Sequence, residues 1–128
     1  SVYYEDTDCS GFVYHTSYIR FAERARFEMM QLISPELTRK LLESEFLFVV
    51  SELSINYFKP LKFQDKIKIL TKIINYSRCS IKLQQDITSN YVLNAKINLK
   101  LVWINSKSGK PSRIPSDLIS RFNLLKIV

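Results

Sequence analysis

Residues 16–34, with the sequence TSYIRFAERARFEMMQLIS, form a long amphipathic segment. Apolar side chains recur there at steps of three and four residues, which predicts a long helix with one apolar stripe. The stripe consists of Tyr18, Phe21, Ala22, Ala25, Met29, Leu32 and Ile33. Thr16 or Ser17 can cap the start of this helix, and Ser34–Pro35 ends it. Pro35 can also open a short second helix that runs to about Ser44.

After this segment the period of the apolar residues changes from 3.6 to two, which predicts strands with one covered face. Such strands are predicted at residues 47–57, 67–73, 81–87 and 94–103. A further strand is predicted at Val2–Tyr4, and a last short helix is predicted from Pro115 to about Leu124. This order indicates an α+β fold with one long helix against a five-stranded antiparallel sheet.

Length and composition indicate one globular domain, which we expect to span residues 1–128. Hydrophobic residues make up 46% of the chain, which excludes a disordered linker. The charge is uneven: residues 1–52 carry nine acids and five bases, whereas residues 53–128 carry three acids and fourteen bases. The basic part indicates an anionic partner (a nucleic acid, a membrane surface, an acidic protein or a polyphosphate ligand) or else a solvated lysine-rich face.

Several absences in the sequence narrow the class of protein further. Cys9 and Cys79 form neither a CxxC pair nor a disulfide framework, so we expect a reducing compartment, the cytoplasm. His15 is the single histidine, so no zinc site is expected. No apolar run approaches the roughly 20 residues that span a bilayer. Because the chain opens at Ser1 without a methionine, we expect a few N-terminal residues to be missing.

The densest group of unusual residues is the loop at positions 3–15, YYEDTDCSGFVYH, directly before the long helix. Glu5, Asp6 and Asp8 lie there before Gly11 and a helix N-terminus, where the helix dipole favours negative charge. Backbone N–H groups at such a terminus can hold an oxyanion. A carboxylate beside them can hydrolyse an activated acyl group, by activating water or by attacking the carbonyl. The residues alone leave open that Asp6 and Asp8 only shape and cap the loop.

The same loop closely resembles the opening of the YbgC-type acyl-CoA thioesterases, which belong to the 4-hydroxybenzoyl-CoA thioesterase family of the hotdog-fold superfamily. The motif Y-x-D-T-D-x-x-G-x-V-Y-H-x-x-Y, followed by E-R-A-R, is matched from Tyr4 to Arg26. The resemblance continues at Phe48–Val50, Tyr57–Pro60, Asp65 and 110–115, and it covers nearly the whole chain. It implies the hotdog fold, in which the sheet wraps around the long central helix.

The resemblance also implies the catalytic groups of a thioesterase. Asp8 would be the catalytic carboxylate, acting as general base toward water or as nucleophile. The oxyanion would be held by backbone N–H groups near Tyr14 and His15, and the His15 side chain would line the site as a catalytic or a structural group. No cofactor is implied, because the coenzyme A ester is the substrate.

Other motif residues would surround the substrate. Gly11 would let the loop pass close to the thioester, and Tyr4 and Tyr18 would contribute to substrate binding. These two tyrosines and Asp6 would shape the loop rather than react. Ser51 departs from the pattern, since some relatives have Arg there, so a polar contact to the substrate would be altered and the acyl preference is open.

Basic residues near a strand turn and a subunit interface hold the coenzyme A phosphates in related hotdog proteins. Arg78, in the turn at Asn75–Arg78, matches such a position best. Lys59, Lys62 and Arg113 are further candidates. Each of these side chains can instead be an ordinary solvated cation.

Two other functions are weighed against the thioesterase. One is a hotdog module without catalysis that binds an acyl-carrier protein, membrane machinery or nucleic acid through its basic part. The loop with Asp8 and His15 favours the enzyme, and nucleic-acid binding is not expected because most aromatic residues precede the basic positions. The other is a hotdog hydratase, whose Asp-x4-His pair differs from the six-residue gap found here.

Association of the chain with copies of itself is expected as well. One helix cannot cover both edges of a sheet, so an exposed strand edge is expected to pair in a homodimer or homotetramer. Members of the family pair in this way and form their sites at the interface. The family is often linked with the Tol-Pal system of the cell envelope, which extends the expectation to peripheral work at the inner membrane.

Overall fold

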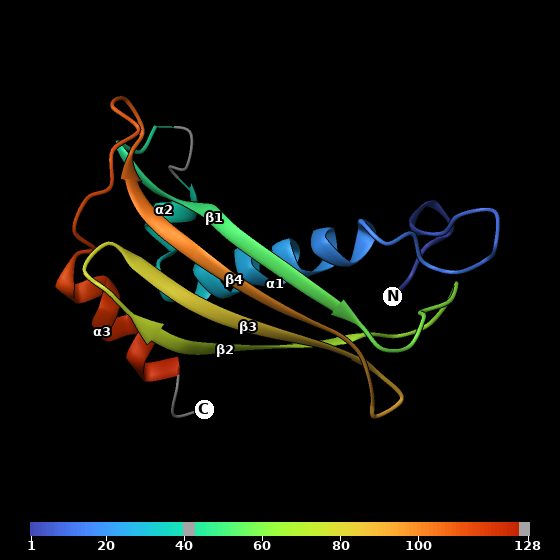
Figure 1. Ribbon diagram of the computed structural model, residues 1–128. Coiled ribbons are helices and arrows are strands. Elements are labelled where there is room, and N and C mark those ends of the chain that lie inside the picture. The colour runs from blue at the N-terminus through green and yellow to red at the C-terminus, as the bar shows by residue number, and fades with distance from the viewer. Residues whose placement is uncertain (40–42, 126–128) are drawn as a thin grey trace.

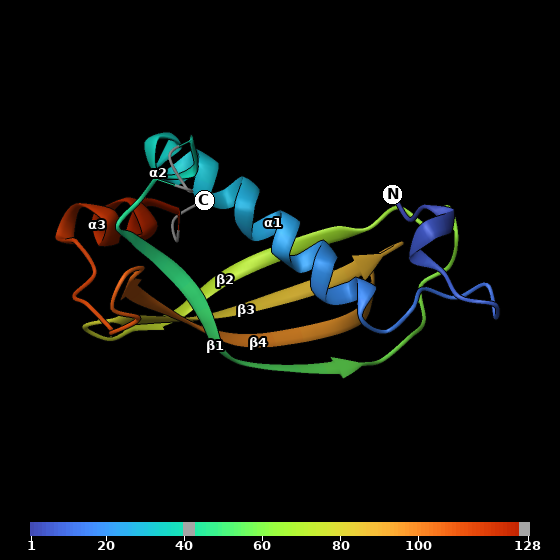
Figure 2. The ribbon, with the colours of Figure 1, turned by 90° about the horizontal axis from the view of Figure 1, so that it is seen from above.

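The computed structural model of the chain describes residues 1–39 and 43–125. In chain order its elements are the 3-10 helix η1 (Tyr4–Asp6), α1 (Ser17–Ile33), α2 (Pro35–Arg39), β1 (Phe46–Tyr57), β2 (Lys68–Tyr76), β3 (Ser80–Ser89), β4 (Val92–Asn105) and α3 (Ser116–Leu125). The long helix α1 lies across one face of a twisted sheet, and α2 and α3 lie near one end of it (Figures 1 and 2). The predicted α+β class is confirmed.

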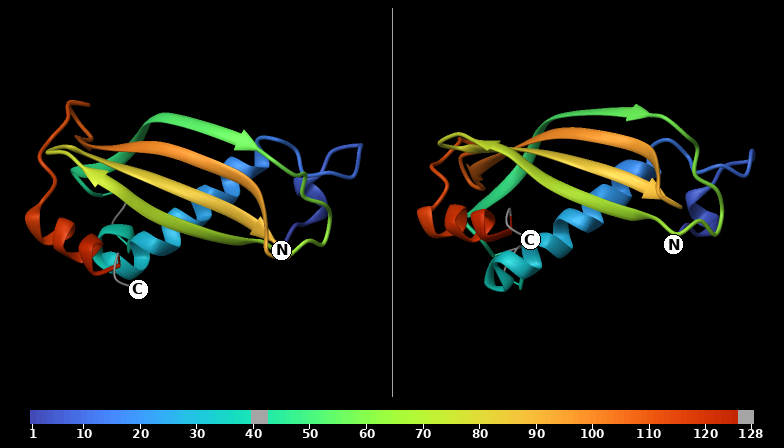
Figure 3. Two further views of the ribbon diagram at one scale, coloured as in Figure 1. Left: turned by 60° about the horizontal axis from the view of Figure 1, so that its bottom comes forward. Right: turned by 90° about the horizontal axis from the view of Figure 1, so that it is seen from below.

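The sheet has four antiparallel strands in the order β1-β4-β3-β2, so β1 and β2 form its two edges (Figure 3). Strands β3 and β4 are joined by a two-residue turn, Asn90–Tyr91, in which both residues have positive φ. This turn geometry matches the twist of the flanking strands. Side chains of β3 and β4 that alternate toward α1 form the core, as the period of two predicts; they include Ile81, Leu83, Ile87, Ala95, Ile97 and Leu99.

The predicted strand at Val2–Tyr4 is wrong, and the sheet has four strands rather than five. The chain turns there instead, because the Asp6 N–H donates to the Tyr3 carbonyl at 3.0 Å. The carboxylate of Asp6, only 2% exposed, also accepts the Tyr3 N–H at 2.9 Å. Asp side chains bind neighbouring backbone in this way at the expense of strand ladders. Val2 is bonded to the loop before β2 rather than to a strand.

Strand β1 contains a bulge at Ser51, which alters the predicted single alternation over 47–57. Phe48 packs against the core before the bulge, and Leu53 and Ile55 pack against it after the bulge. An extra residue in a strand moves the side chains that follow to the other face. The predicted alternation, in which Leu47 and Val49 share the covered face with Leu53 and Ile55, is therefore correct only in the second half of the strand.

Both short helices expected from proline positions are present. Helix α2 is described up to Arg39, and residues 40–42 of the segment predicted to reach Ser44 lie outside the described residues. Helix α3 covers the stretch predicted after Pro115. Within residues 1–39 and 43–125, no helix is both long and apolar enough to cross a membrane.

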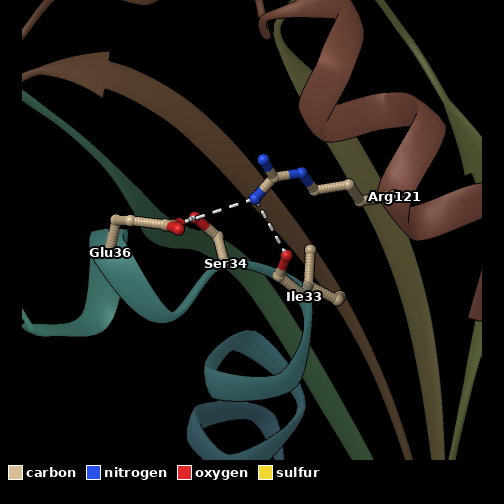
Figure 4. A network of polar contacts seen from close by, with 4 residues as sticks. All are labelled: Ile33, Ser34, Glu36 and Arg121. Carbon is tan, nitrogen blue, oxygen red and sulfur yellow. Dashed lines mark hydrogen bonds and ion pairs between the residues drawn. The ribbon is translucent and has the colours of Figure 1, made fainter.

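Arg121 of α3 attaches this helix to the end of α1 (Figure 4). Its guanidinium donates to the Ile33 carbonyl at 3.2 Å and lies 3.6 Å from the Glu36 carboxylate. The Ser34 hydroxyl donates to the same carboxylate at 3.3 Å. A cation beside the last carbonyls of a helix is favoured by the helix dipole. The backbone N–H of Glu36, together with Arg121, holds the pKa of this carboxyl below its ordinary value.

An aromatic cluster fills the space under α3. The ring of Phe48 lies 4.7 Å from the ring of Trp103 and 6.1 Å from that of Phe122. Phe122 comes from α3 and is completely buried. The core is therefore closed at this end by a side chain from the last described helix.

Candidate active site

The loop between η1 and α1 is folded back on itself by backbone hydrogen bonds. The Asp8 N–H donates to the Phe12 carbonyl at 3.0 Å, and the Gly11 N–H donates to the Asp8 carbonyl at 3.1 Å. Thr7 and Val13 face each other in an antiparallel bridge. Gly11 has φ of +85°, and no atom lies within 4 Å of the place of a Cβ. Glycine is therefore required here by backbone conformation rather than by lack of space.

Asp8 lies exposed in this loop and is bound by its neighbour Ser10. The Ser10 hydroxyl and the Ser10 N–H both donate to Asp8 Oδ1, the N–H at 2.8 Å. These two bonds, with a smaller contribution from His15, hold the pKa of the Asp8 carboxyl below its ordinary value. Hydrogen bonds to the charged form favour ionisation, so Asp8 is a carboxylate at neutral pH.

The turn before α1 leaves two backbone donors without partners. The Tyr14 N–H donates to the Asp6 carbonyl at 2.8 Å, and the Ser17 N–H donates to the Tyr14 carbonyl at 2.9 Å. In the described part of the chain, the N–H groups of His15 and Thr16 have no protein acceptor. Of the residues predicted near an oxyanion, His15 thus offers an N–H, whereas that of Tyr14 is already used. Thr16 offers a second one that the sequence did not single out.

A hollow of about 260 Å³ opens beside the start of α1. It is lined by Val13, His15, Tyr18, Tyr57, Phe58, Lys59 and Pro60. The Tyr57 hydroxyl donates to the His15 carbonyl at 2.6 Å, and the Leu61 N–H donates to the Tyr18 hydroxyl at 3.0 Å. These bonds attach the segment after β1 to the start of α1. They bring together three of the predicted site residues, His15, Tyr18 and Lys59.

Tyr57 is a site residue to which the sequence assigned no role. Its ring meets that of Tyr18 edge-on, with 5.0 Å between the centroids. Partial burial raises the pKa of both phenols, so both hydroxyls are protonated at neutral pH. Tyr57 belongs to the matched segment Tyr57–Pro60, yet a pattern of residues does not say that this strand end meets a turn 42 positions earlier.

Asn94 of β4 fixes the backbone on the other side of the hollow. Its carbonyl accepts the N–H groups of Phe58 at 2.8 Å and Lys59 at 3.2 Å. Its side-chain Nδ2 donates to the Lys59 carbonyl at 3.1 Å, and the residue is only 3% exposed. The wall that carries Tyr57 and Lys59 is therefore held by the sheet as well as by the helix.

The remaining predicted loop residues make contacts among themselves and with the loop before β2. Tyr4 is 78% exposed, and its ring meets Phe63 edge-on at 6.0 Å. Asp6 is buried and binds the Tyr3 backbone, as described above. Among the described residues, no group of three or more His, Cys, Asp or Glu side chains could hold a metal ion.

The predicted phosphate-binding residues fall into two groups. Lys59 lines the hollow, and Lys62 is bridged to the loop through its backbone. Arg78 and Arg113 lie at the opposite end, where the turn between β2 and β3 meets the segment before α3 through the Arg78 carbonyl (Figure 1). One chain therefore does not bring Arg78 and Asp8 together.

A long helix laid across a twisted antiparallel sheet, with an acidic loop before its N-terminus, is the arrangement of the hotdog-fold thioesterases. The chain matches the model of the thioesterase-like superfamily over residues 2–122 and belongs to this family. It is 32% identical over 125 residues to the acyl-CoA thioesterase YbgC of Haemophilus influenzae. The aligned region covers 98% of this chain and 92% of that protein. The YbgC of Helicobacter pylori is 30% identical, over 89% and 90% of the two chains. The resemblance to YbgC-type thioesterases is confirmed.

Solved structures agree with this assignment of the fold. A thioesterase from Thermus thermophilus, complexed with coenzyme A and Zn, superposes with a TM-score of 0.87 at 25% identity, over 100% of this chain and 91% of that one. A 1,4-dihydroxy-2-naphthoyl-CoA thioesterase from Synechocystis superposes with a TM-score of 0.86 at 20% identity, over 96% and 91%. The second likeness concerns the fold alone.

Proposed function

We propose that this protein hydrolyses acyl-CoA thioesters to a free acid and coenzyme A. The observation that carries the proposal is the ionised Asp8, in a closed loop directly before a helix terminus with two unpaired N–H groups. A carboxylate and an oxyanion site are together sufficient for an activated ester with a good leaving group. Membership in a family whose relatives are named acyl-CoA thioesterases supports the same reaction.

In the first form of the mechanism, Asp8 acts as a general base. Its carboxylate takes a proton from water while the water oxygen attacks the thioester carbon. The N–H groups of His15 and Thr16 receive the developing oxyanion. The tetrahedral intermediate then expels the coenzyme A thiolate, which takes the proton from Asp8 and so restores the carboxylate, and the carboxylic acid leaves.

In the second form, Asp8 is the nucleophile. Its carboxylate attacks the thioester carbon, the thiolate leaves, and a mixed anhydride remains that water hydrolyses. A single turnover in ¹⁸O-labelled water detects the second form when water attacks the Asp8 carbon of the anhydride, because the label then enters Asp8. A general base gains no label, and trapping of the anhydride with hydroxylamine detects the second form when water attacks the acyl carbon instead.

The proposal is tested with Asp8→Asn on a panel of short-chain, medium-chain, long-chain and aromatic acyl-CoA substrates. We expect the wild-type protein to turn over at least one class and the variant to lose at least about 10²-fold in kcat. Glu5→Gln is the matched control, because Glu5 is an exposed acid of the same loop. No turnover by the wild type, or undiminished turnover by Asp8→Asn, contradicts the proposal.

For the coenzyme A phosphates we propose two contributions, Lys59 from the chain that holds the thioester and Arg78 from a second copy. The turn between β2 and β3, which contains Arg78, lies at the opposite end of the sheet from the loop before α1 (Figure 1), and this separation supports the division. Strands β1 and β2 are edge strands at which a homodimer or homotetramer can form. Arg78→Glu is expected to raise KM for an acyl-CoA but not for the matching acyl-pantetheine, which lacks the nucleotide. An equal effect on both substrates contradicts this assignment.

A further inference from the structure

One hydrogen bond links the end of β1 to the backbone of the oxyanion region. The Tyr57 hydroxyl donates to the His15 carbonyl oxygen, with 2.6 Å between the two oxygens. His15 lies in the turn that leads into α1, and its own N–H and that of Thr16 have no acceptor in the described part of the chain. A side chain from the sheet thus holds the His15–Thr16 peptide group, which carries the second of these two donors.

The geometry of a peptide group makes this bond consequential. The His15 carbonyl and the Thr16 N–H belong to one peptide unit, which is planar and trans, so they point in opposite directions. Fixing the carbonyl therefore fixes the direction of the N–H. A donor on the carbonyl also polarises the whole amide, because hydrogen bonds in a chain strengthen one another. The Thr16 N–H becomes a better donor as a result.

Tyr57 is itself held in place by its surroundings. Its ring packs edge-on against Tyr18, and the next two residues are bonded to the carbonyl of Asn94. The Tyr18 hydroxyl accepts the Leu61 N–H, so both sides of the segment are tied down. The Tyr57 side chain is therefore held in the orientation in which its hydroxyl reaches the His15 carbonyl.

We propose that Tyr57 is a positioning residue that holds the N–H group of Thr16 aimed at the carbonyl oxygen of the bound thioester. The inference rests on the thioesterase function proposed above and goes beyond it by assigning the group that orients the oxyanion site. Tyr57 touches the peptide and not the reacting atoms. Partial burial, which raises the pKa of Tyr57, keeps the hydroxyl protonated in the neutral range where it must donate.

The first test is Tyr57→Phe, which removes the hydroxyl and keeps the ring that packs on Tyr18. We expect kcat to fall about tenfold, less than the roughly 10²–10³-fold loss when an oxyanion donor itself is removed. KM and the melting temperature should change little. Tyr91→Phe is the matched control, because Tyr91 is fully exposed in the turn between β3 and β4.

The second test asks for signals that a merely structural residue would not produce. In ¹⁵N-labelled protein, Tyr57→Phe should shift the Thr16 amide resonance upfield and leave that of Val13, bonded to Leu61, nearly unchanged. A 3-fluorotyrosine at position 57 keeps the ring and has a more acidic phenol. Below the pH at which it ionises, it should raise kcat above the wild-type value, whereas the same replacement at Tyr91 should not.

The outcomes separate this inference from the proposed function. An active wild type whose kcat is within twofold of that of Tyr57→Phe overturns the inference alone. A loss of kcat that comes with a raised KM or a lowered melting temperature, with no response to 3-fluorotyrosine, also overturns it. A wild type without thioesterase turnover overturns the proposed function first, and with it the role assigned to Tyr57.

Discussion

Ser10 binds the carboxylate of Asp8 through two donors, its N–H at 2.8 Å and its hydroxyl, and both bonds reach the same oxygen, Oδ1. The second oxygen of the carboxylate accepts no hydrogen bond from the described residues. The Ser10 residue therefore sets the ionisation of Asp8 without occupying the whole group.

The first prediction concerns this pair. Ser10→Ala removes the hydroxyl, the strongest influence on the pKa of Asp8, so that pKa should rise toward the ordinary aspartate value of 3.8. In the proposed mechanism Asp8 acts as a carboxylate, so activity should be lost as pH falls through its pKa. The acid limb of kcat/KM should move to higher pH in Ser10→Ala and stay in place in Ser10→Thr, and NMR titration of the Asp8 carboxyl carbon should agree. If the acid limb of kcat/KM stays in place in Ser10→Ala, the ionisation of Asp8 does not cause that limb.

The second prediction concerns the backbone of the loop. Gly11→Ala should lower the free energy of unfolding by about 1–2 kcal/mol, because an L residue at positive φ is strained although the space is open. Gly109→Ala is the matched control, since Gly109 has φ of +71° and equally open space. Chemical denaturation should give similar losses for both, and only Gly11→Ala should reduce kcat. Equal kcat in the two variants would show that the loop conformation does not matter for turnover.

The third prediction concerns a buried polar network between the sheet and α1. Gln85 is completely buried; it accepts from Arg26 at 2.9 Å and donates to the Ala22 carbonyl at 3.0 Å and the Thr71 hydroxyl at 3.1 Å. Gln85→Leu should lower the free energy of unfolding by about 3 kcal/mol, because a guanidinium in a buried site loses its partner. Gln84→Leu, on the other face of the same strand, should change it by less than about 0.5 kcal/mol.

A result in which the two glutamine variants unfold alike would mean that the network is not a source of stability. The prediction has a second readout, because burial lowers the pKa of Arg26 from its ordinary value, the Glu23 charge opposes that shift, and the Arg26 guanidinium donates to Gln85. The loss in Gln85→Leu should therefore persist across the pH range in which Arg26 stays charged.

The parts of the fold that follow from periodicity were predictable. The long helix and the four strands after it have runs of apolar residues at steps of 3.6 and two, and these patterns depend only on which face is covered. The segment at Val2–Tyr4 has the composition of a strand, but the Asp6 carboxylate accepts a hydrogen bond from the Tyr3 N–H, and the chain turns there. The bulge at Ser51 has no signal in the alternation on either side of it. Whether a side chain binds the backbone in place of a neighbouring strand, and where a strand contains a bulge, depend on geometry rather than on composition.

The sequence predicts the loop of the candidate site but not the contacts made by Tyr57–Pro60, which line the hollow beside it. The motif around Asp8 is contiguous in sequence, so a resemblance finds it. The bond from Tyr57 to His15 spans 42 positions, and the bonds from Asn94 to Lys59 span 35. Contacts of this kind arise only when β1 and β4 are paired and α1 is laid across them. The sequence pattern identifies the segment Tyr57–Pro60 but does not show which contacts its residues make.

The burial of Phe122 affects the order of folding during synthesis. This side chain, with no exposed surface, completes the cluster of Phe48 and Trp103, and it comes from α3. A nascent chain that has emerged only as far as β4 therefore presents an open aromatic pocket to its surroundings. The core can close at this end only once α3 has been synthesised, so complete folding needs the last described helix.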